Sequence, residues 1–340
     1  MKSKSLSNMG AGGLYCFVHF TVDAACFYFL FARLSAHPML AVLALFYDAL
    51  AFPTQSLFGI LADRFPRFNG GLVGSLMIAA ALMLPWSLPA LILVGLGNAL
   101  AHIDGARHTL CGADGKIAPC GIYVSGGSVG VITGQLMART CSVALPLGLI
   151  LLSALLTLWL AHKHIPVRTD ANGFHLHAGH SLSMIVLLAF VAVAVRAYIG
   201  FAIPTGWNQT TFHAVLLYIS MAAGKLTGGL LCDHIGFRKT TALSIGLSLP
   251  LLLLGDSAMV LSLIGIGLFS MTMPVTVALL VSVLPEEPCF AFGITTVALF
   301  VGTVPAFFIR PETLLAHQIT VLLLSVLAAG CLHRTLKKGC

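Results

Sequence analysis

Long apolar stretches follow one another along almost the whole chain, and short polar turns separate them. A membrane-spanning helix needs about 17–25 predominantly apolar residues, and twelve stretches reach or approach that length. They are residues 13–34, 39–62, 71–84, 89–104, 121–137, 143–161, 182–204, 212–232, 240–254, 259–284, 290–309 and 314–332. The third stretch is short and several boundaries are soft, so counts of ten or eleven are the alternatives. The pattern predicts an all-α membrane protein with twelve transmembrane helices.

A charged turn follows the second apolar stretch and returns after the eighth. Its two aspartates, Asp63 and Asp233, are 170 residues apart in a chain of 340 residues. The turn comprises Gly59, Asp63, Arg64 and Arg67 in the first copy, and Gly229, Asp233, Gly236, Arg238 and Lys239 in the second. Repeated halves are common in secondary transporters. We therefore expect two six-helix bundles in parallel repeat, over residues 1–162 and 182–340, with a cytoplasmic linker over residues 163–181.

Glycines inside the spans recur at nearly the same spacing. Gly95, Gly97, Gly121 and Gly130 in the first half are matched by Gly265, Gly267, Gly293 and Gly302 in the second. In lipid, helices approach each other closely at small residues. We expect these glycines to mark helix crossings within each half.

The composition is that of a membrane protein, with 58% hydrophobic and only 9% charged residues, whereas a soluble domain has about 25% charged residues. Lys and Arg concentrate in short cytoplasmic loops. With the N-terminus inside, the basic residues on the cytoplasmic side are Lys2, Lys4, Arg64, Arg67, Arg107, Lys116, Lys163, Arg168, Arg238, Lys239, Arg334, Lys337 and Lys338. The net charge of +7 is then a topological signal and not one of nucleic-acid binding, which needs a basic face on a soluble module. This places a multi-pass protein in the cell (inner) membrane, with both termini cytoplasmic.

Charged residues inside the spans are the candidates for binding and coupling, because an unpaired charge at the bilayer centre costs at least about 2.5–3.5 kcal/mol. Asp23 lies ten residues into its span, about 15 Å from the start and near the midplane. His19 is four residues earlier on the same helix face, so the pair can pass a proton. Asp48 is a second deep carboxylate. In the repeat register Arg196 falls close to Asp23, which predicts one central cavity faced by both.

Two roles are open for Arg196, which could bind an anionic group of the substrate or serve as counter-ion to Asp23 or Asp48. A permanent ion pair without a part in turnover is the structural alternative. Polar residues that could line the same cavity, or bond a neighbouring helix backbone, are Gln55, Asn98 and Gln135. Lys225 lies eight residues before Asp233, and we expect its side chain to extend toward the cytoplasmic surface.

The charged turns have a physical role that follows from their position. A carboxylate at Asp63 or Asp233 lies where the dipoles of neighbouring helix N-termini favour negative charge. We expect such contacts, together with the basic residues, to hold an inner gate closed in the outward-open state. Simple charged anchors that satisfy the topology are the alternative, although anchoring needs Lys or Arg and no aspartate.

No metal site or cofactor is predicted. Nine cysteines are scattered along the chain without an extracellular framework, which indicates reduced thiols. Cys111 and Cys120 have only His108 as a nearby further ligand. The histidines of the polar linker are residues 162, 164, 175, 177 and 180, and Asp170 is the only carboxylate among them.

These motifs resemble those of a known family. The two charged turns resemble the loop motif between helices 2 and 3, and 8 and 9, of the major facilitator superfamily. Three further segments resemble the fosmidomycin-resistance type of that family: His19 with Asp23 in helix 1, His102 with Asp104 and Arg107 at the end of helix 4, and Gly126 to Gly134 in helix 5. The chain departs from the pattern at Pro66, Ile103 and Asp104, and in the loop from Gly112 to Pro119.

The resemblance implies a secondary active transporter that works by alternating access. Proton-coupled efflux of a small organic solute, an antiport, is the leading expectation. Proton-coupled uptake of a small metabolite by symport is the alternative, followed by a non-transporting sensor or scaffold. An enzyme is not expected, because the chain has no metalloprotease, nucleophile-elbow or phosphate-loop motif. The expected partners are the solute, protons and the bilayer, and the chain is expected to be a monomer that binds no nucleic acid.

Overall fold

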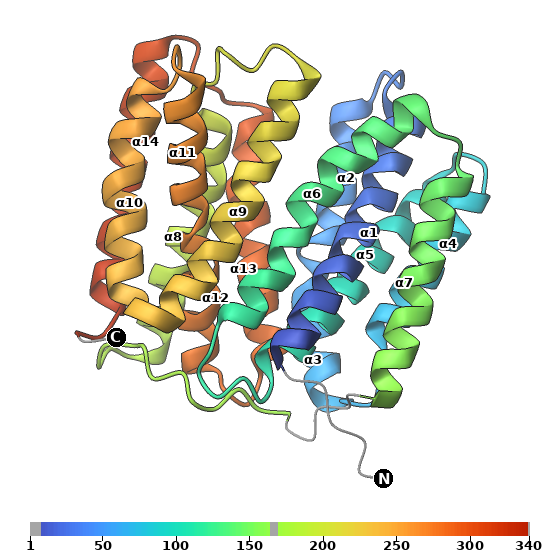
Figure 1. Ribbon diagram of the computed structural model, residues 1–340, viewed down its shortest axis with the longest axis horizontal. Coiled ribbons are helices and arrows are strands. Elements are labelled where there is room, and N and C mark those ends of the chain that lie inside the picture. The colour runs from blue at the N-terminus through green and yellow to red at the C-terminus, as the bar shows by residue number, and fades with distance from the viewer. Residues whose placement is uncertain (1–7, 164–168, 339–340) are drawn as a thin grey trace.

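The computed structural model describes residues 8–163 and 169–338, which form an almost entirely helical molecule (Figure 1). The predictions made for Lys2, Lys4, His164 and Arg168 lie outside the described residues. The helices of the first half are α1 (Asn8–Leu34), α2 (Leu40–Ala51), α3 (Thr54–Arg64), α4 (Gly70–Met83), α5 (Leu88–Leu110), α6 (Ala118–Thr140) and α7 (Ala144–Lys163).

The second half contains α8 (Leu182–Ala202), α9 (Thr211–Ile235), α10 (Phe237–Leu254), α11 (Met259–Ser270), α12 (Thr272–Val283), α13 (Pro288–Thr303), the short 3₁₀ helix η1 (Val304–Phe307) and α14 (Leu314–Thr335). Two spans are each built from two helices. Pro53 separates α2 from α3 and Pro274 follows the break between α11 and α12, because proline has no N–H to continue the helical hydrogen bonds. With α2–α3 and α11–α12 counted once each, the described residues form the twelve expected spans.

Length and hydropathy agree with membrane crossing for most of these spans. Ten of them are long and apolar enough to cross a membrane, among the described residues. Of the other two, α4 has 14 residues and is a shorter apolar helix, and α6 is rich in glycine. The fourth span is longer than predicted, because α5 continues past Asp104 to Leu110. Its polar end remains helical since Asp104 and Arg107 bond each other there.

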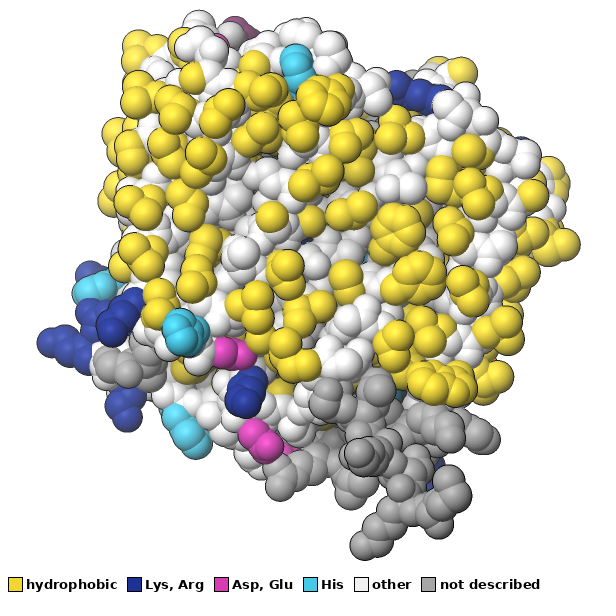
Figure 2. All heavy atoms as spheres, in the orientation of Figure 1, with side chains coloured by type: hydrophobic (Ala, Val, Ile, Leu, Met, Phe, Trp, Pro, Cys, Tyr) yellow, Lys and Arg dark blue, Asp and Glu magenta, His cyan; other side chains and the backbone are white. Residues whose placement is uncertain are grey.

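The two halves stand side by side, with α1 to α7 on one side of Figure 1 and α8 to α14 on the other. The helix α1 begins and α14 ends at the lower end of this view, which we call the terminal end; the opposite end is the far end. Hydrophobic side chains cover most of the face shown in Figure 2, and charged side chains gather mainly along its lower edge. This distribution is that of a protein surrounded by lipid with one charged, water-facing end.

Glycines allow the halves to touch at the terminal end. A Cβ at Gly59 would lie 2.6 Å from the Cys289 carbonyl oxygen, so α3 and α13 meet without side chains between them. Gly229 and Gly121 make the same kind of contact between α9 and α6, where a Cβ on Gly121 would lie 2.9 Å from the Gly229 Cα.

The expectation that the repeated glycines lie at crossings within each half is thus wrong for Gly121 and Gly293. Gly121 packs on α9, and Gly293 packs on Ser56 of α3, so both lie at crossings between the halves. The expectation holds for Gly97 against Gly74 of α4 and for Gly302 against Ala194 of α8. The spacing in the sequence shows which glycines correspond to each other in the two repeats, but it does not show which helix packs against each glycine.

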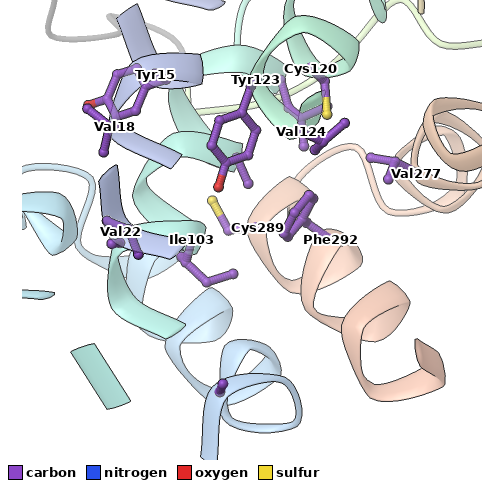
Figure 3. Close-up of a cluster of buried hydrophobic side chains, with 14 of the residues drawn as sticks. Tyr15, Val18, Val22, Ile103, Cys120, Tyr123, Val124, Val277, Cys289 and Phe292 are labelled. Atoms are coloured by element: carbon purple, nitrogen blue, oxygen red, sulfur yellow. The ribbon is translucent and has the colours of Figure 1, made fainter. Parts of the chain in front are cut away.

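A shared hydrophobic core joins the halves next to these crossings. Figure 3 shows Tyr123 and Val124 of α6 facing Phe292 of α13 and Val277 of α12. The Tyr123 and Phe292 rings are 6.3 Å apart between centroids, and both side chains are buried. The terminal end is therefore closed by packed side chains and not only by charged loops.

The linker also contacts both halves. The Gly112 amide donates to the Asp170 carbonyl over 3.2 Å, and the Ala171 amide donates to the Pro285 carbonyl over 2.8 Å. Phe174 and Leu176 are buried. The segment was expected to be a polar loop, but its apolar residues pack beneath the terminal end and cross from the first half to the second.

Candidate functional site

A buried polar cluster lies between α1 and α5 in the first half. His19 and Asp23 come from successive turns of α1, and Asn98 and His102 from successive turns of α5. The Asn98 side-chain amide donates to Asp23 Oδ1 over 3.0 Å. His19 Nε2 is 3.2 Å from Asp23 Oδ2, and His102 Nε2 is 3.7 Å from Asp23 Oδ1. Three residues of the proposed proton site and one of the helix 4 motif are therefore in direct contact.

The ring nitrogens of the two histidines determine what this cluster can hold. His19 Nδ1 is 3.1 Å from the Tyr123 carbonyl oxygen, and His102 Nδ1 is 2.8 Å from the Asn98 carbonyl oxygen. A carbonyl can only accept, so a hydrogen bond at either contact assigns the hydrogen to Nδ1. The two Nε2 atoms then face each other at 2.8 Å. Two lone pairs repel at that distance, so a contact this short is a hydrogen bond from one ring to the other, and the Asp23 carboxylate lies beside both rings.

The same three residues could also hold a metal ion, because His19, Asp23 and His102 each offer a ligand atom within 4.8 Å of the others. Two nitrogens on one tetrahedral zinc would be about 3.3 Å apart, given bonds of about 2.0–2.1 Å. The observed Nε2 separation of 2.8 Å is shorter, and it matches a hydrogen bond. A hydrogen bond between the two rings fits this geometry better than a metal.

Helix α6 closes over the cluster. A Cβ on Gly127 would lie 2.6 Å from Asp23 Oδ2, so only glycine lets α6 pass this close. The Tyr123 hydroxyl donates to the His102 carbonyl over 2.8 Å. Water therefore reaches the cluster poorly in this conformation, and the glycine-rich segment of α6 serves the close approach.

The rest of the helix 4 motif forms a second buried group nearer the terminal end. Arg107 donates to Asp104 Oδ1 over 2.6 Å, and the Tyr15 hydroxyl donates to Asp104 Oδ2 over 2.9 Å. Arg107 also donates to the carbonyls of Pro66 and Phe68, both over 2.9 Å. The helix 4 motif thus holds the first charged turn in place through the backbone carbonyls of Pro66 and Phe68. Pro66 is the position at which this turn departs from the glycine of the family motif.

Asp63 crosses from the first half to the second. Its carboxylate accepts from the amides of Cys289 over 3.1 Å and Phe290 over 2.9 Å, in the first turn of α13. The residue before that helix, Glu287, makes no side-chain cap of its own. Asp63 therefore supplies the missing cap from another helix, and its charge is favoured by the helix dipole.

Asp233 makes the equivalent contact in the opposite direction. It accepts from the amides of Ile117 over 2.8 Å and Ala118 over 2.9 Å, at the start of α6. Helix α6 likewise has no side-chain cap from its own N-cap residue, Ile117. Each half thus caps one helix of the other half with a repeat-related aspartate.

The remaining residues of the charged turns play smaller geometric parts. Arg64, Arg67 and Lys239 are exposed at the terminal end. Gly236 has φ of 92°, which ends α9 and starts α10 in a conformation that favours glycine. One Arg238 Nη atom lies 3.4 Å from the His333 ring nitrogens.

A cavity of about 520 Å³ lies in the second half, and two positively charged side chains from membrane-spanning helices line it. Arg196 of α8 and Lys225 of α9 line it, and it extends to Thr205 in the loop at the far end. Lys225 Nζ donates to the Ser128 hydroxyl of α6 over 2.7 Å. The expectation that Lys225 extends to the terminal surface is therefore wrong. Eight helical residues measure about 12 Å, which is longer than a lysine side chain.

Arg196 does not pair with Asp23. One guanidinium nitrogen lies 3.4 Å from the Thr272 hydroxyl, and none of the ion pairs of the described residues includes Arg196. All residues that line the cavity belong to the second half. Asp23 is thus not among the residues that line the cavity of Arg196, and the expected pairing of these two residues in one central cavity is not what the described residues show.

Three other predicted residues lie apart from the cluster. Asp48 of α2 is half-buried, and its carboxylate has no hydrogen-bond partner among the described residues. Gln55 of α3 is buried, and its Nε2 donates to the Ala51 carbonyl over 2.7 Å. Gln135 of α6 lies beside the side chain of Tyr218, which lines the cavity.

Sequence reasoning missed Lys225, Ser128 and Tyr218 as parts of this region. For Lys225 a signal was present, since a lysine two turns inside an apolar span has to face protein or water. Ser128 and Tyr218 carried no signal in the sequence, because serine and tyrosine are common inside membrane helices. The packing of α6 on α9 brings Ser128 to Lys225, which lines the cavity together with Tyr218.

No protein-family model matches this sequence, and no curated protein matches it in a sequence comparison. The major facilitator superfamily transporter FucP, in the outward conformation, is similar in structure with a TM-score of 0.65 and 13% sequence identity, over 95% of this chain and 97% of that chain. A second structure, a variant of the E. coli fucose:proton symporter FucP, has a TM-score of 0.60 and 12% identity over the same shares of 95% and 97%.

The human organic anion transporter MFSD10 (TETRAN) has a TM-score of 0.68 and 13% identity, over 97% of this chain and 100% of that chain. Identities this low concern the fold, and the near-complete coverage extends that likeness over both halves. The chain therefore has the fold of the major facilitator superfamily of transporters.

Proposed function

We propose that the protein is a secondary active transporter, which carries a small organic solute across a membrane by alternating access. The observation that supports this most strongly is the mutual capping at the terminal end, of α13 by Asp63 and of α6 by Asp233. Repeat-related residues close this end, while the cavity extends toward the other. Residues 1–162 and 182–340 then rock as two units, and opening the terminal end breaks both caps.

Coupling to protons is the second part of the proposal. The His19–His102 pair holds one proton beside Asp23, and this group lies in the membrane-spanning part of α1 and α5. A buried group of this kind binds or releases a proton only when one side of the protein opens to water. Protonation and the direction of opening are thereby linked.

Efflux in exchange for protons is the direction that the resemblance to fosmidomycin-resistance transporters favours. It rests on the His19 and Asp23 pair, the helix 4 motif from His102 to Arg107, and the glycines of α6. In this mode a proton entering from outside resets the empty carrier.

Uptake by symport is a second candidate, favoured by the charge of the cavity. Lys225 lies in the electric field of both Asp23 and Arg196, so the solute site and the proton site influence each other. A proton on the histidine pair strengthens the binding of a negative solute nearby and weakens that of a positive one. An anion would thus travel with the proton, whereas a cation would exchange against it.

The proposed setting is the cell (inner) membrane with the terminal end in the cytoplasm, and the proposed form is a monomer, since one chain contains the cavity and both caps. In a cysteine-free background, Asn172→Cys in the linker and Glu312→Cys in the last far-end loop test the orientation. We expect an impermeant thiol reagent outside intact cells to label only the second. Labelling of the linker position from outside would reverse the assignment.

Reconstitution tests the transport proposal itself. In proteoliposomes with an imposed pH gradient, we expect at least one solute from a panel of sugars, organic acids, amines and drugs to accumulate, and a protonophore to stop it. An internal pH dye reports whether protons move with the solute or against it. Accumulation that a protonophore leaves unchanged would contradict proton coupling. Alternating access has a separate test. A thiol reagent should reach the buried Cys120 and Cys289 when the terminal end opens during transport, and a lack of reaction under all these conditions would contradict alternating access.

A further inference from the structure

The cavity in the second half has an unusual charge balance. Arg196 and Lys225 line it, and no aspartate or glutamate is among its lining residues. The rest of the wall is largely apolar and aromatic, with Phe201, Tyr218 and Phe269. Its volume of about 520 Å³ is within the range of about 300–1,000 Å³ for small-molecule sites.

The protein leaves most of the hydrogen-bonding capacity of these cations unused. Arg196 has five N–H donors, and its side chain has one partner among the described residues, the Thr272 hydroxyl at 3.4 Å. Lys225 bonds the Ser128 hydroxyl over 2.7 Å. Both partners are neutral. No carboxylate of the described residues forms an ion pair with either cation.

The nearest carboxylate is already engaged. Asp23 acts on Lys225 electrostatically, but its oxygens bond Asn98 and lie beside His19 and His102. Two positive charges that also repel each other inside a membrane protein are costly without a counter-charge. A ligand that carries negative charge into the cavity removes this cost.

We propose that the cavity binds an organic anion, with an oxyanion group such as a carboxylate between Arg196 and Lys225 and an apolar or aromatic body against Phe201, Tyr218 and Phe269. The planar guanidinium of Arg196 presents two parallel N–H groups to such an oxyanion, and Lys225 adds a point charge. This inference rests on the proposed function, since it names the class of solute that the transporter carries, and of the two directions it favours uptake by symport.

Binding to the purified full-length protein in detergent tests the inference without any gradient. The probes are benzoate and phenylphosphonate, with neutral benzamide and cationic benzylamine as partners of similar size. We expect both anions to raise the unfolding temperature and to bind in the millimolar range or tighter, as fits ligands of about ten heavy atoms. Benzamide and benzylamine should bind at least tenfold more weakly than benzoate.

Variants locate the site. Arg196→Gln and Lys225→Gln should each weaken benzoate binding at least tenfold, whereas Arg196→Lys, which keeps the charge, should lose less. Lys338→Gln removes one exposed positive charge far from the cavity and should leave benzoate binding unchanged. A variant that no longer folds is recognised by its unfolding temperature without ligand. In that case the test is the benzoate affinity of Arg196→Lys compared with that of the native protein.

Several results would overturn the inference. They are equal binding of benzamide and benzoate, preference for benzylamine, unchanged benzoate affinity in Arg196→Gln, and the absence of anion binding up to about 10 mM. These outcomes are separate from failure of the proposed function. If the protein binds benzoate but transports no solute, the anion site stands and the transporter proposal fails. If it accumulates a neutral sugar and binds no anion, the transporter proposal stands and only this inference fails.

Discussion

Asp23→Asn is expected to abolish proton-driven accumulation of the solute while exchange of solute across the membrane continues. The asparagine keeps the size of the side chain and the contact with Asn98, but it removes the charge that balances a proton between His19 and His102. The pair then stays in one protonation state through the cycle. With a gradient of one pH unit, one coupled proton supports about a tenfold solute gradient, and we expect this gradient to disappear.

Proteoliposomes provide the measurement, with accumulation under a pH gradient compared with counterflow of labelled solute at equal pH. Counterflow also serves as the control for folding, because an unfolded carrier loses both activities. Glu312→Gln neutralises an exposed carboxylate at the far end and should behave as the native protein. Full accumulation by Asp23→Asn would remove this residue from the coupling mechanism, and loss of counterflow as well would assign it a structural or solute-binding role.

Asp63→Asn and Asp233→Asn are expected to shift the protein toward the state in which the terminal end is open. Each change leaves one acceptor oxygen, but it removes the charge and the second acceptor at a helix N-terminus of the other half. In the proposed alternating-access cycle, these contacts exist only while the terminal end is closed. Their loss should change the equilibrium by about 1–3 kcal/mol, or about 5- to 150-fold, and lower turnover in both variants.

Native cysteines can report this opening. Cys289 lies at the Asp63 contact and Cys120 near the Asp233 contact, and both are fully buried. All cysteines except one are removed. Thiol labelling of Asp63→Asn is then measured at Cys120, and that of Asp233→Asn at Cys289, so that each substitution is tested at the contact that it does not alter. We expect the rate of thiol labelling to rise in both cases, and the two changes to add in the double variant. Cys26, buried inside the first half, should stay unreactive.

The crossed design separates rocking of the halves from local loosening. If each substitution exposed only the cysteine beside it, the aspartates would be local helix caps and not parts of one gate. Labelling that increases instead at a cysteine placed at Thr205, on the far-end side of the cavity, would show that these contacts do not favour closure of the terminal end.

The motifs at the ends of helices could be predicted from the sequence because they depend on local order. Asp63 and Asp233 each end a long apolar segment, so their place at a membrane surface follows from chain order. Their position beside helix N-termini was also expected on grounds of charge. Which helices they would meet could not be derived, since α13 and α6 belong to the other half and lie far away along the chain.

Within the polar cluster, the sequence predicted the pair on one helix, named Asn98 as a possible neighbour from another helix, and missed the contact with His102. His19 and Asp23 are one turn apart, and this spacing alone places them together. The contact with His102 depends on the rotation of α5 against α1. Lys225 was assigned to the surface, and Arg196 was left with two roles, anion binding or an ion pair with Asp23 or Asp48, because a sequence gives the depth of a charge in the membrane but not the direction in which its side chain leaves the helix.

The sequence by itself determined the class of the protein: twelve apolar spans, two repeated halves and a charged turn at the same place in each. These features follow from the thickness of the bilayer and from the need to satisfy every backbone group inside a helix. Only the tertiary structure decided that each half caps a helix of the other, that two histidines face each other beside Asp23, and that Arg196 and Lys225 share a cavity without a carboxylate. These are contacts between helices, and they depend on how each helix is rotated and on which glycines allow close approach, which the order of apolar and polar residues in lipid leaves open.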